Sequence, residues 1–279
     1  MTGYSIFEDT LADMTWPAVE QAAQANTPLL VPVAVIEQHS RHLPLATDTY
    51  AAYLLCTLIK RGLAEAGIAS VIAPPYYFGV NSTTGTFPGS LTVRAETMAK
   101  VLTETLENCA RWGFRRQFIV NHHGDPVHSS AVLRTIRALR AEGIEATLVL
   151  AGQALGWVDA TRVRGDDAVL LVPDSEVTAA ARTHLTKSKL DVHAAERETS
   201  LIMRFFPGTL APGVDIRGLE PVPETMEQFR DAETVGGWRA LSPDGHIGDP
   251  AVATPENGRL YELEATDAVA AIAEALRDG

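Results

Sequence analysis

The sequence predicts an α/β fold, a three-layer α/β/α sandwich around a mainly parallel central sheet. Short apolar runs rich in Val, Leu and Ile alternate with longer amphipathic stretches between residues 10 and 151. An uninterrupted apolar run is typical of a strand buried on both faces of a parallel sheet, and helices must then cover both of those faces. Neither an internal repeat nor a linker composition interrupts the chain, so residues 1–279 are predicted to form a single domain.

The predicted elements follow one another regularly in the first half of the chain. Gly67, Gly113 and Gly143 each follow a helical pattern, and glycine readily closes a helix because it tolerates the left-handed conformation. Segment 74–89 is predicted to be a loop because it is rich in Gly, Pro, Asn, Ser and Thr. The expected helices are 10–24, 49–66, 92–112 and 127–142, and the expected strands are 29–36, 70–73, 117–120 and 146–151.

Beyond residue 152 the pattern weakens. Residues 152–174 give no clear prediction, whereas 175–186, 195–206 and 264–277 have helical spacing. Segment 207–258 is rich in Pro and Gly, and a long irregular stretch in a compact enzyme is more often functional or interface-forming than disordered. We therefore expect it to contribute to the site or to subunit contacts.

Composition narrows the possible partners. The chain has 23 basic against 35 acidic residues and a net charge of -12, which argues against nucleic acid or an anionic membrane as the main partner. The first residues lack the basic and apolar regions of a secretory signal, and no apolar stretch has the length of a transmembrane helix. Cys56 and Cys109 do not suggest a disulfide framework, so a cytoplasmic enzyme is expected.

Three clusters of histidines and carboxylates follow apolar segments or lie near them, and together they contain five of the eight histidines. The first two follow the strands predicted at 29–36 and 117–120, and the carboxyl ends of parallel strands lie at one edge of a sheet. Carboxylates and imidazoles gathered there are the ligands that divalent metals prefer. The clusters are Glu37, His39, His42 and Asp48; His122, His123 and Asp125; and Asp191, His193, Glu196 and Glu198.

Each of these residues also has an ordinary structural explanation. Asp48 could cap the helix predicted at 49–66, and Glu198 could stabilise the start of the helix at 195–206. A single histidine at a strand end is more often a hydrogen-bonding residue than a metal ligand. The joint pattern, with carboxylates beside the histidines in every cluster, is what favours a metal site.

Several motifs, in order, resemble the creatininase family of metal-dependent amidohydrolases. Glu-x-His followed by Leu-Pro-Leu-x-Thr-Asp at 37–48 is similar to the family signature, and Phe-Pro-Gly-Ser at 87–90 resembles Phe-Pro-Gly-Thr. Asn-His-His-Gly-Asp-Pro at 121–126 resembles Asn-Gly-His-Gly-Gly-Asn, and residues 193–200 resemble His-Ala-Gly-x-x-Glu-Thr-Ser. The resemblance spans residues 25–275 and implies the α/β/α fold, a small-molecule substrate and a homo-oligomer, often a hexamer.

The resemblance also implies two divalent metal ions per chain, usually zinc or manganese and sometimes iron. Carried over by motif, one ion is held by Glu37, Asp48 and His123, and the other by His39, the shared Asp48 and Glu198. A bridging carboxylate is physically sensible because its two oxygens can each bind one ion. Asp125 is an alternative to Glu198 as a ligand, or else a substrate contact.

A mechanism follows from this arrangement. Two cations lower the pKa of a shared water, which gives a metal-bridging hydroxide as nucleophile, and they polarise the scissile carbonyl. His193 matches a catalytic histidine of the family and is the candidate acid/base, with a purely structural role as the alternative. The loop containing Ser82 and Thr84 is predicted to line the mouth of the site, so these two residues are candidate substrate contacts together with Asp125.

Departures from the family pattern bear on the substrate. Thr83-Thr84 replace an acidic-His pair, and Gly124, Lys189 and Val192 occupy positions that creatinine hydrolases use around creatinine. We therefore expect cleavage of a non-peptide C–N bond, a cyclic amide or a formamide, in a small polar molecule other than creatinine. The alternatives are a modified-peptide peptidase or a deformylase of cofactor biosynthesis, and, in another class, a non-catalytic metal-binding scaffold.

Overall fold

A sheet of five parallel strands forms the centre of the molecule in the computed structural model, which describes residues 4–152, 154, 163–223, 228 and 237–278. The strand order is β2-β1-β3-β4-β5, and every neighbouring pair is parallel. The strands are β1 (Leu29–Val33), β2 (Val71–Ile72), β3 (Arg116–Asn121), β4 (Glu145–Ala151) and β5 (Val169–Val172).

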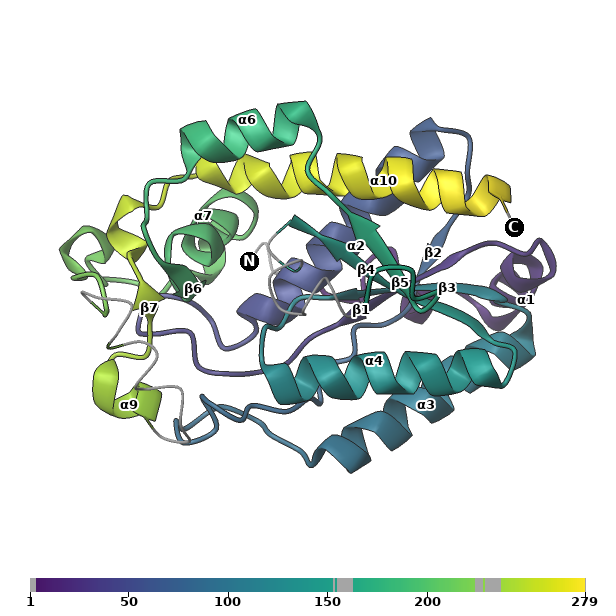
Figure 1. Ribbon diagram of the computed structural model, residues 1–279, viewed down its shortest axis with the longest axis horizontal. Coiled ribbons are helices and arrows are strands. Elements are labelled where there is room, and N and C mark those ends of the chain that lie inside the picture. Colours follow the sequence, from purple (N-terminus) through teal and green to yellow (C-terminus); the bar gives the residue numbers. More distant parts are fainter. Residues whose placement is uncertain (1–3, 153, 155–162, 224–227, 229–236, 279) are drawn as a thin grey trace.

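Helices cover both faces of this sheet (Figure 1). Alternate residues of β1 enter different cores: Leu29, Val31 and Val33 pack on one face and Leu30 on the other. This division confirms the predicted three-layer α/β/α architecture. One layer contains α1 (Trp16–Gln24), α3 (Ala95–Trp112) and α4 (Pro126–Ala141), and the other contains α2 (Thr47–Glu65) and α10 (Leu260–Asp278).

A smaller assembly lies at one end of the sandwich, where Figure 1 shows β6, β7, α7 and α9 grouped together. Its two strands are antiparallel, and Ala194, with φ 48°, turns the chain from β6 into the following helix. The elements are α6 (Glu176–Leu185), β6 (Asp191–His193), α7 (Glu196–Phe205), α9 (Gly237–Leu241) and β7 (Ile247–Gly248). The described part of segment 207–258 otherwise consists of loops and single 3-10 turns, at Pro207–Thr209, Ile216–Gly218, Pro250–Val252 and Asn257–Arg259.

Apart from shifts of one to four residues at helix and strand ends, the structure differs from the predicted elements in the following places. The helix predicted at 10–24 is divided into a 3-10 turn, Leu11–Asp13, and α1, because Met14 is extended and Pro17 lies in the first turn of α1. β1 ends at Val33 rather than Ile36. β5 lies within the segment that gave no clear prediction. The helices predicted at 175–186, 195–206 and 264–277 are present. Among the described residues, no helix has the length and apolar character needed to cross a bilayer.

Candidate metal centre

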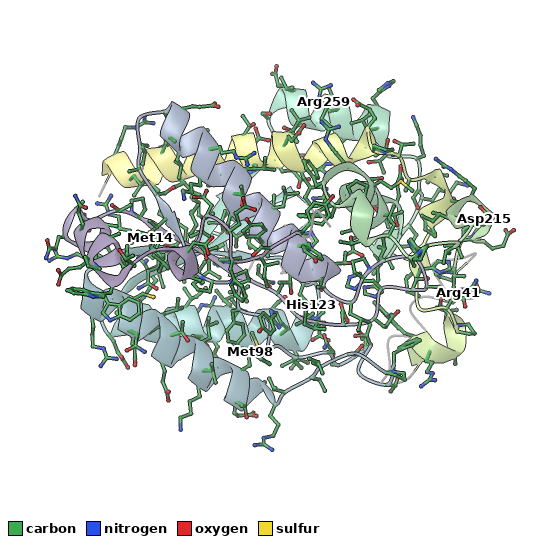
Figure 2. The ribbon with its side chains drawn as sticks, turned by 180° about the vertical axis from the view of Figure 1, so that it is seen from behind. Met14, Arg41, Met98, His123, Asp215 and Arg259 are labelled. Carbon is green, nitrogen blue, oxygen red and sulfur yellow. The ribbon has the colours of Figure 1, made fainter. Side chains whose placement is uncertain are left out.

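The polar residues of the first two clusters meet beyond the carboxyl ends of β1 and β3, which are paired in register. After Val33 the chain leaves the sheet, and Glu37 is fixed by a hydrogen bond from its amide to Leu45 O (3.0 Å). His123 follows β3 directly and lies inside the molecule rather than at its periphery, where Arg41 and Asp215 are found (Figure 2). Asp48 lies in the first turn of α2 but does not cap it, because the N-cap residue is Ala46 and no side chain caps this helix.

The first candidate ligand set consists of Glu37, Asp48 and His123. The Nδ1 atom of His123 lies 3.1 Å from Glu37 Oε1 and 3.0 Å from Asp48 Oδ2. The other ring nitrogen, Nε2, lies 3.0 Å from Val80 O and donates its hydrogen there. That bond leaves the lone pair of Nδ1 directed at two carboxylate oxygens, an arrangement that only a cation or a proton can stabilise.

The second candidate set repeats this arrangement with His39, Asp48 and Glu198. The Nε2 atom of His39 is 3.3 Å from Asp48 Oδ1 and 3.6 Å from Glu198 Oε2, while Nδ1 donates to Glu37 O over 3.1 Å. Within the described residues, Nε2 has no hydrogen-bond partner although it is fully buried. Asp48 therefore presents Oδ2 to the first set and Oδ1 to the second.

The carboxylates of both ligand sets are buried, so their negative charges are not stabilised by water. Glu37, Asp48 and Glu198 are 2%, 2% and 8% exposed, and three buried carboxylates require compensating positive charge. Burial alone would lower the pKa of His39, but Asp48, Glu198 and Glu37 outweigh it and raise that pKa to about 10. The pKa of Asp48 moves well below its usual range because His39, His122 and His123 outweigh its burial. The pocket thus stabilises cations.

The donor set fits two divalent metal ions. Within each set the candidate ligand atoms lie within 4.8 Å of one another, and all five residues predicted as ligands are brought together. Imidazole and carboxylate ligands of this kind suit zinc and manganese. A third set, Glu37, His39 and His193, also meets this distance limit, and it shares two of its members with the other sets.

His193 lies beside both sets. Its Nε2 atom is 2.7 Å from Gln38 O, and its Nδ1 atom is 3.7 Å from Glu37 Oε1. The Gln38 side chain is held by Ser40 N at Oε1 and by Gly245 O at Nε2, so its amide orientation is determined. His193 Nε2 can donate to Gln38 O at 2.7 Å or accept from the side-chain Nε2 of Gln38 at 3.0 Å. We assign the hydrogen to the shorter contact with Gln38 O, which leaves the lone pair of Nδ1 facing the centre.

Of the three candidate substrate contacts, Thr84 contacts a candidate ligand, whereas Asp125 and Ser82 bind each other. Asp125 Oδ2 accepts from Ser82 N and Oγ, and Oδ1 accepts from Val127 N and His128 N at the start of α4. The hydroxyl of Thr84 donates to Glu37 Oε2. Both Asp125 oxygens thus have protein donors, which leaves Glu198 as the geometrically better member of the second ligand set. The prediction that Ser82, Thr84 and Asp125 contact substrate stays a prediction.

Two further residues become visible in the structure. His42 does not face either ligand set; its Nε2 lies 2.8 Å from Thr199 Oγ1, next to Glu198 in sequence. Gln38 was not singled out by the sequence analysis, yet its main chain and its side chain both contact His193. The only signal for it in the sequence is its position between Glu37 and His39.

Comparison with known proteins agrees with this geometry. The chain matches the family described as "Creatininase: Creatinine amidohydrolase" over residues 12–273. The chain belongs to the creatininase family. It is therefore a hydrolase of a family that acts on C–N bonds, and its predicted resemblance to that family is confirmed.

Individual creatininase-family relatives carry different names. The mycofactocin precursor peptide peptidase of Mycolicibacterium smegmatis is 31% identical over 238 residues, covering 85% of this chain and 80% of that protein. The creatinine amidohydrolase of Pseudomonas putida is 27% identical over 282 residues and covers 96% of both chains. A solved structure described as "Creatininase Mn" has a TM-score of 0.64 at 21% identity, covering 97% of this chain and 98% of its own, and confirms the fold.

Proposed function

We propose that this creatininase-family chain is a hydrolase with a dinuclear metal site. Glu37, Asp48 and His123 would hold one ion, and His39, Asp48 and Glu198 the other. The observation that carries the proposal is the split of the Asp48 carboxylate, with Oδ2 3.0 Å from His123 and Oδ1 3.3 Å from His39. A carboxylate whose two oxygens face two imidazole lone pairs is suited to bridge two ions.

Zinc and manganese are the ions that we propose, because both suit imidazole and carboxylate ligands, and manganese appears in the name of a structural neighbour. Bound at this centre, two such ions would supply Lewis acidity for the scissile carbonyl and would lower the pKa of a bound water. A non-catalytic metal-binding scaffold is the rival from another class, and the completeness of both ligand sets supports the hydrolase instead.

His193 is proposed as the acid/base residue. Because Gln38 O accepts the hydrogen on Nε2, the ring exchanges protons at Nδ1, which faces the centre. Gln38 fixes the orientation of the His193 ring by contacting Nε2, the nitrogen that faces away from the centre. Thr84 limits the rotation of Glu37 by donating to its outer oxygen, so Glu37 Oε1 stays directed at His123. These contacts keep the groups in place before substrate arrives.

The substrate that we propose is a peptide amide, with a lactam or formamide of a small polar molecule as the second candidate. Support for the first is the 31% identity to a protein named for cleaving a precursor peptide, against 27% to a creatinine amidohydrolase. Support for the second is the resemblance of the motifs to amidohydrolases. The altered residues Gly124, Lys189 and Val192 argue against creatinine in either case.

Metal analysis and a substrate panel test the proposal together. Chain purified after growth with added zinc or manganese should contain two ions, and mass spectrometry should detect cleavage of short peptides more readily than of hydantoin-like rings, lactams or formamides. Fewer than one ion per chain would contradict the dinuclear hydrolase. Two ions with hydrolysis of rings or formamides only would overturn the peptide assignment and keep the hydrolase.

A further inference from the structure

His122 lies between Asp48 of the candidate metal centre and Tyr261 of helix α10. It is 3% exposed, and its amide donates to Val33 O (3.0 Å), which fixes it between the ends of β3 and β1. Its ring lies between two partners: Nδ1 is 3.5 Å from Asp48 Oδ1, and Nε2 is 3.2 Å from the hydroxyl of Tyr261. Neither ligand set includes this imidazole.

The hydrogens in this chain of contacts are assigned so that no lone pair of His122 faces the Asp48 carboxylate. Burial raises the pKa of Tyr261, so its hydroxyl keeps its hydrogen. That hydroxyl donates to His122 Nε2, and the hydrogen of the ring is then on Nδ1, facing the carboxylate oxygen of Asp48. His122 Nδ1 thus lies in polar contact, at 3.5 Å, with the same Asp48 oxygen that faces His39.

Tyr261 is itself held firmly. It is fully buried in the first turn of α10, and the guanidinium carbon of Arg197 lies 4.3 Å from the centre of its ring. Arg197 also binds both carboxylate oxygens of Glu264, one turn further along the same helix. The hydroxyl of Tyr261 is therefore a fixed point from which His122 can orient Asp48.

We propose that His122 is a positioning residue that keeps Asp48 Oδ1 turned toward His39 and Glu198, and so sets the affinity of the second metal site. This inference rests on the proposed dinuclear function. An aspartate side chain rotates about both its Cα–Cβ and its Cβ–Cγ bonds, so the carboxylate can pivot about Oδ2, the oxygen that His123 contacts. Without the contact of His122 with Oδ1, the carboxylate can turn away from the second site while it keeps its contact with the first.

Calorimetric titration of metal-free protein with Mn²⁺ tests the proposal. His122→Phe keeps a ring but removes both nitrogens, and it should raise the Kd of the second ion about 10- to 100-fold, the usual effect of losing a contact that orients a metal ligand. The Kd of the first ion should change much less. Tyr261→Phe removes only the anchoring oxygen and should shift the second Kd in the same direction by a smaller factor.

Tyr53→Phe is the matched control, because this buried tyrosine bonds only the main chain of Glu8 among the described contacts of its hydroxyl. It should leave both Kd values unchanged. A role that is only structural would lower the melting temperature without separating the two affinities, and that outcome would overturn the inference. If His122→Phe does not fold, Tyr261→Phe decides: a wild-type second Kd overturns the proposal.

The outcomes also distinguish a failure of this inference from a failure of the proposed dinuclear hydrolase function. A wild-type chain that takes up fewer than two ions contradicts the dinuclear hydrolase itself. A wild-type chain that binds two ions, together with variants that bind both with unchanged affinity, contradicts the role of His122 alone. The absorption spectrum of the Co²⁺-loaded protein gives a second readout, since a turned Asp48 changes the ligand field of one ion only.

Discussion

Asp125 holds Ser82 twice, through the main-chain amide at 2.6 Å and the hydroxyl at 2.5 Å from the same carboxylate oxygen. Its other oxygen caps α4 by accepting from Val127 N and His128 N. This carboxylate therefore fixes the loop that brings Thr84 to Glu37, and it does so with donors on both oxygens. The first prediction separates this clamp from a role as metal ligand.

Asp125→Asn should keep both metal ions and lower stability. The amide nitrogen is a donor placed against existing donors, so the cap or the Ser82 clamp is lost at a cost of about 1–2 kcal/mol. Glu198→Gln should instead lose one of the two ions. Metal analysis and urea unfolding of both variants check this prediction, with exposed Glu104→Gln as the control. Loss of one ion from Asp125→Asn would assign Asp125 to the second site.

Asp48→Ala should remove both ions and all hydrolysis. Each ligand set loses its shared member and keeps only one histidine and one glutamate. Asp13→Ala is the matched control, because Asp13 is exposed and lies in a separate 3-10 turn. Metal content per chain after dialysis is the measurement. A variant that retained two ions would show that Asp48 does not bridge.

His193→Gln should keep both ions and lose turnover by a factor of about 100 to 10,000, the range for removing a general acid/base. The glutamine can still donate to Gln38 O, but it has no ring nitrogen to exchange protons at the position of Nδ1. Metal content measured beside turnover on the substrate found in the panel separates the alternatives. Loss of an ion would place His193 among the ligands, and unchanged turnover would make its role structural.

Local patterns in the sequence were sufficient to predict the central layers and half of the site. Apolar runs ending at polar clusters predicted that Glu37 and His123 follow strand ends at the same edge of a parallel sheet. The structure adds that these two strands are neighbours. The helix of Asp48 was also predicted, although it begins at Thr47 rather than residue 49. The alternation of β1 between two cores followed from its apolar composition alone.

The parts that could not be predicted depend on contacts between distant segments. Glu198 was assigned to the centre only through the family resemblance, because the pairing of β6 with β7 that places it there gives no periodic signal. Strand β7 is only two residues long. The contact of His122 with Tyr261 joins positions 139 residues apart. Ser82 was predicted to contact substrate because its polar loop was expected at the mouth of the site, and Asp125 because of its place in the second motif. Only the fold shows that their polar atoms bind each other.

Glu264 is buried and forms ion pairs with both Arg197 and Arg182, and these contacts predict a pH dependence of stability. Burial alone would raise the pKa of Glu264, but Arg197 and Arg182 outweigh it and hold that pKa below its usual 4.5. Ionised Glu264 therefore stabilises the fold above pH 4.5, and this contribution is lost as pH falls through the lower pKa of the folded state. Glu264→Gln should cost about 3–5 kcal/mol at neutral pH, because both guanidinium groups lose their shared partner.

Urea unfolding of the wild type and Glu264→Gln between pH 4 and 7 measures this contribution. The difference in unfolding free energy should be constant at the upper end of that range and should shrink as pH falls below 4.5. Comparing the two proteins at each pH cancels the titration of the metal-site residues, which they share. Glu256→Gln is the control, because Glu256 and its partner Arg259 are both more than half exposed and their pair contributes little. A difference that grew toward low pH would mean that Glu264 is neutral in the folded protein.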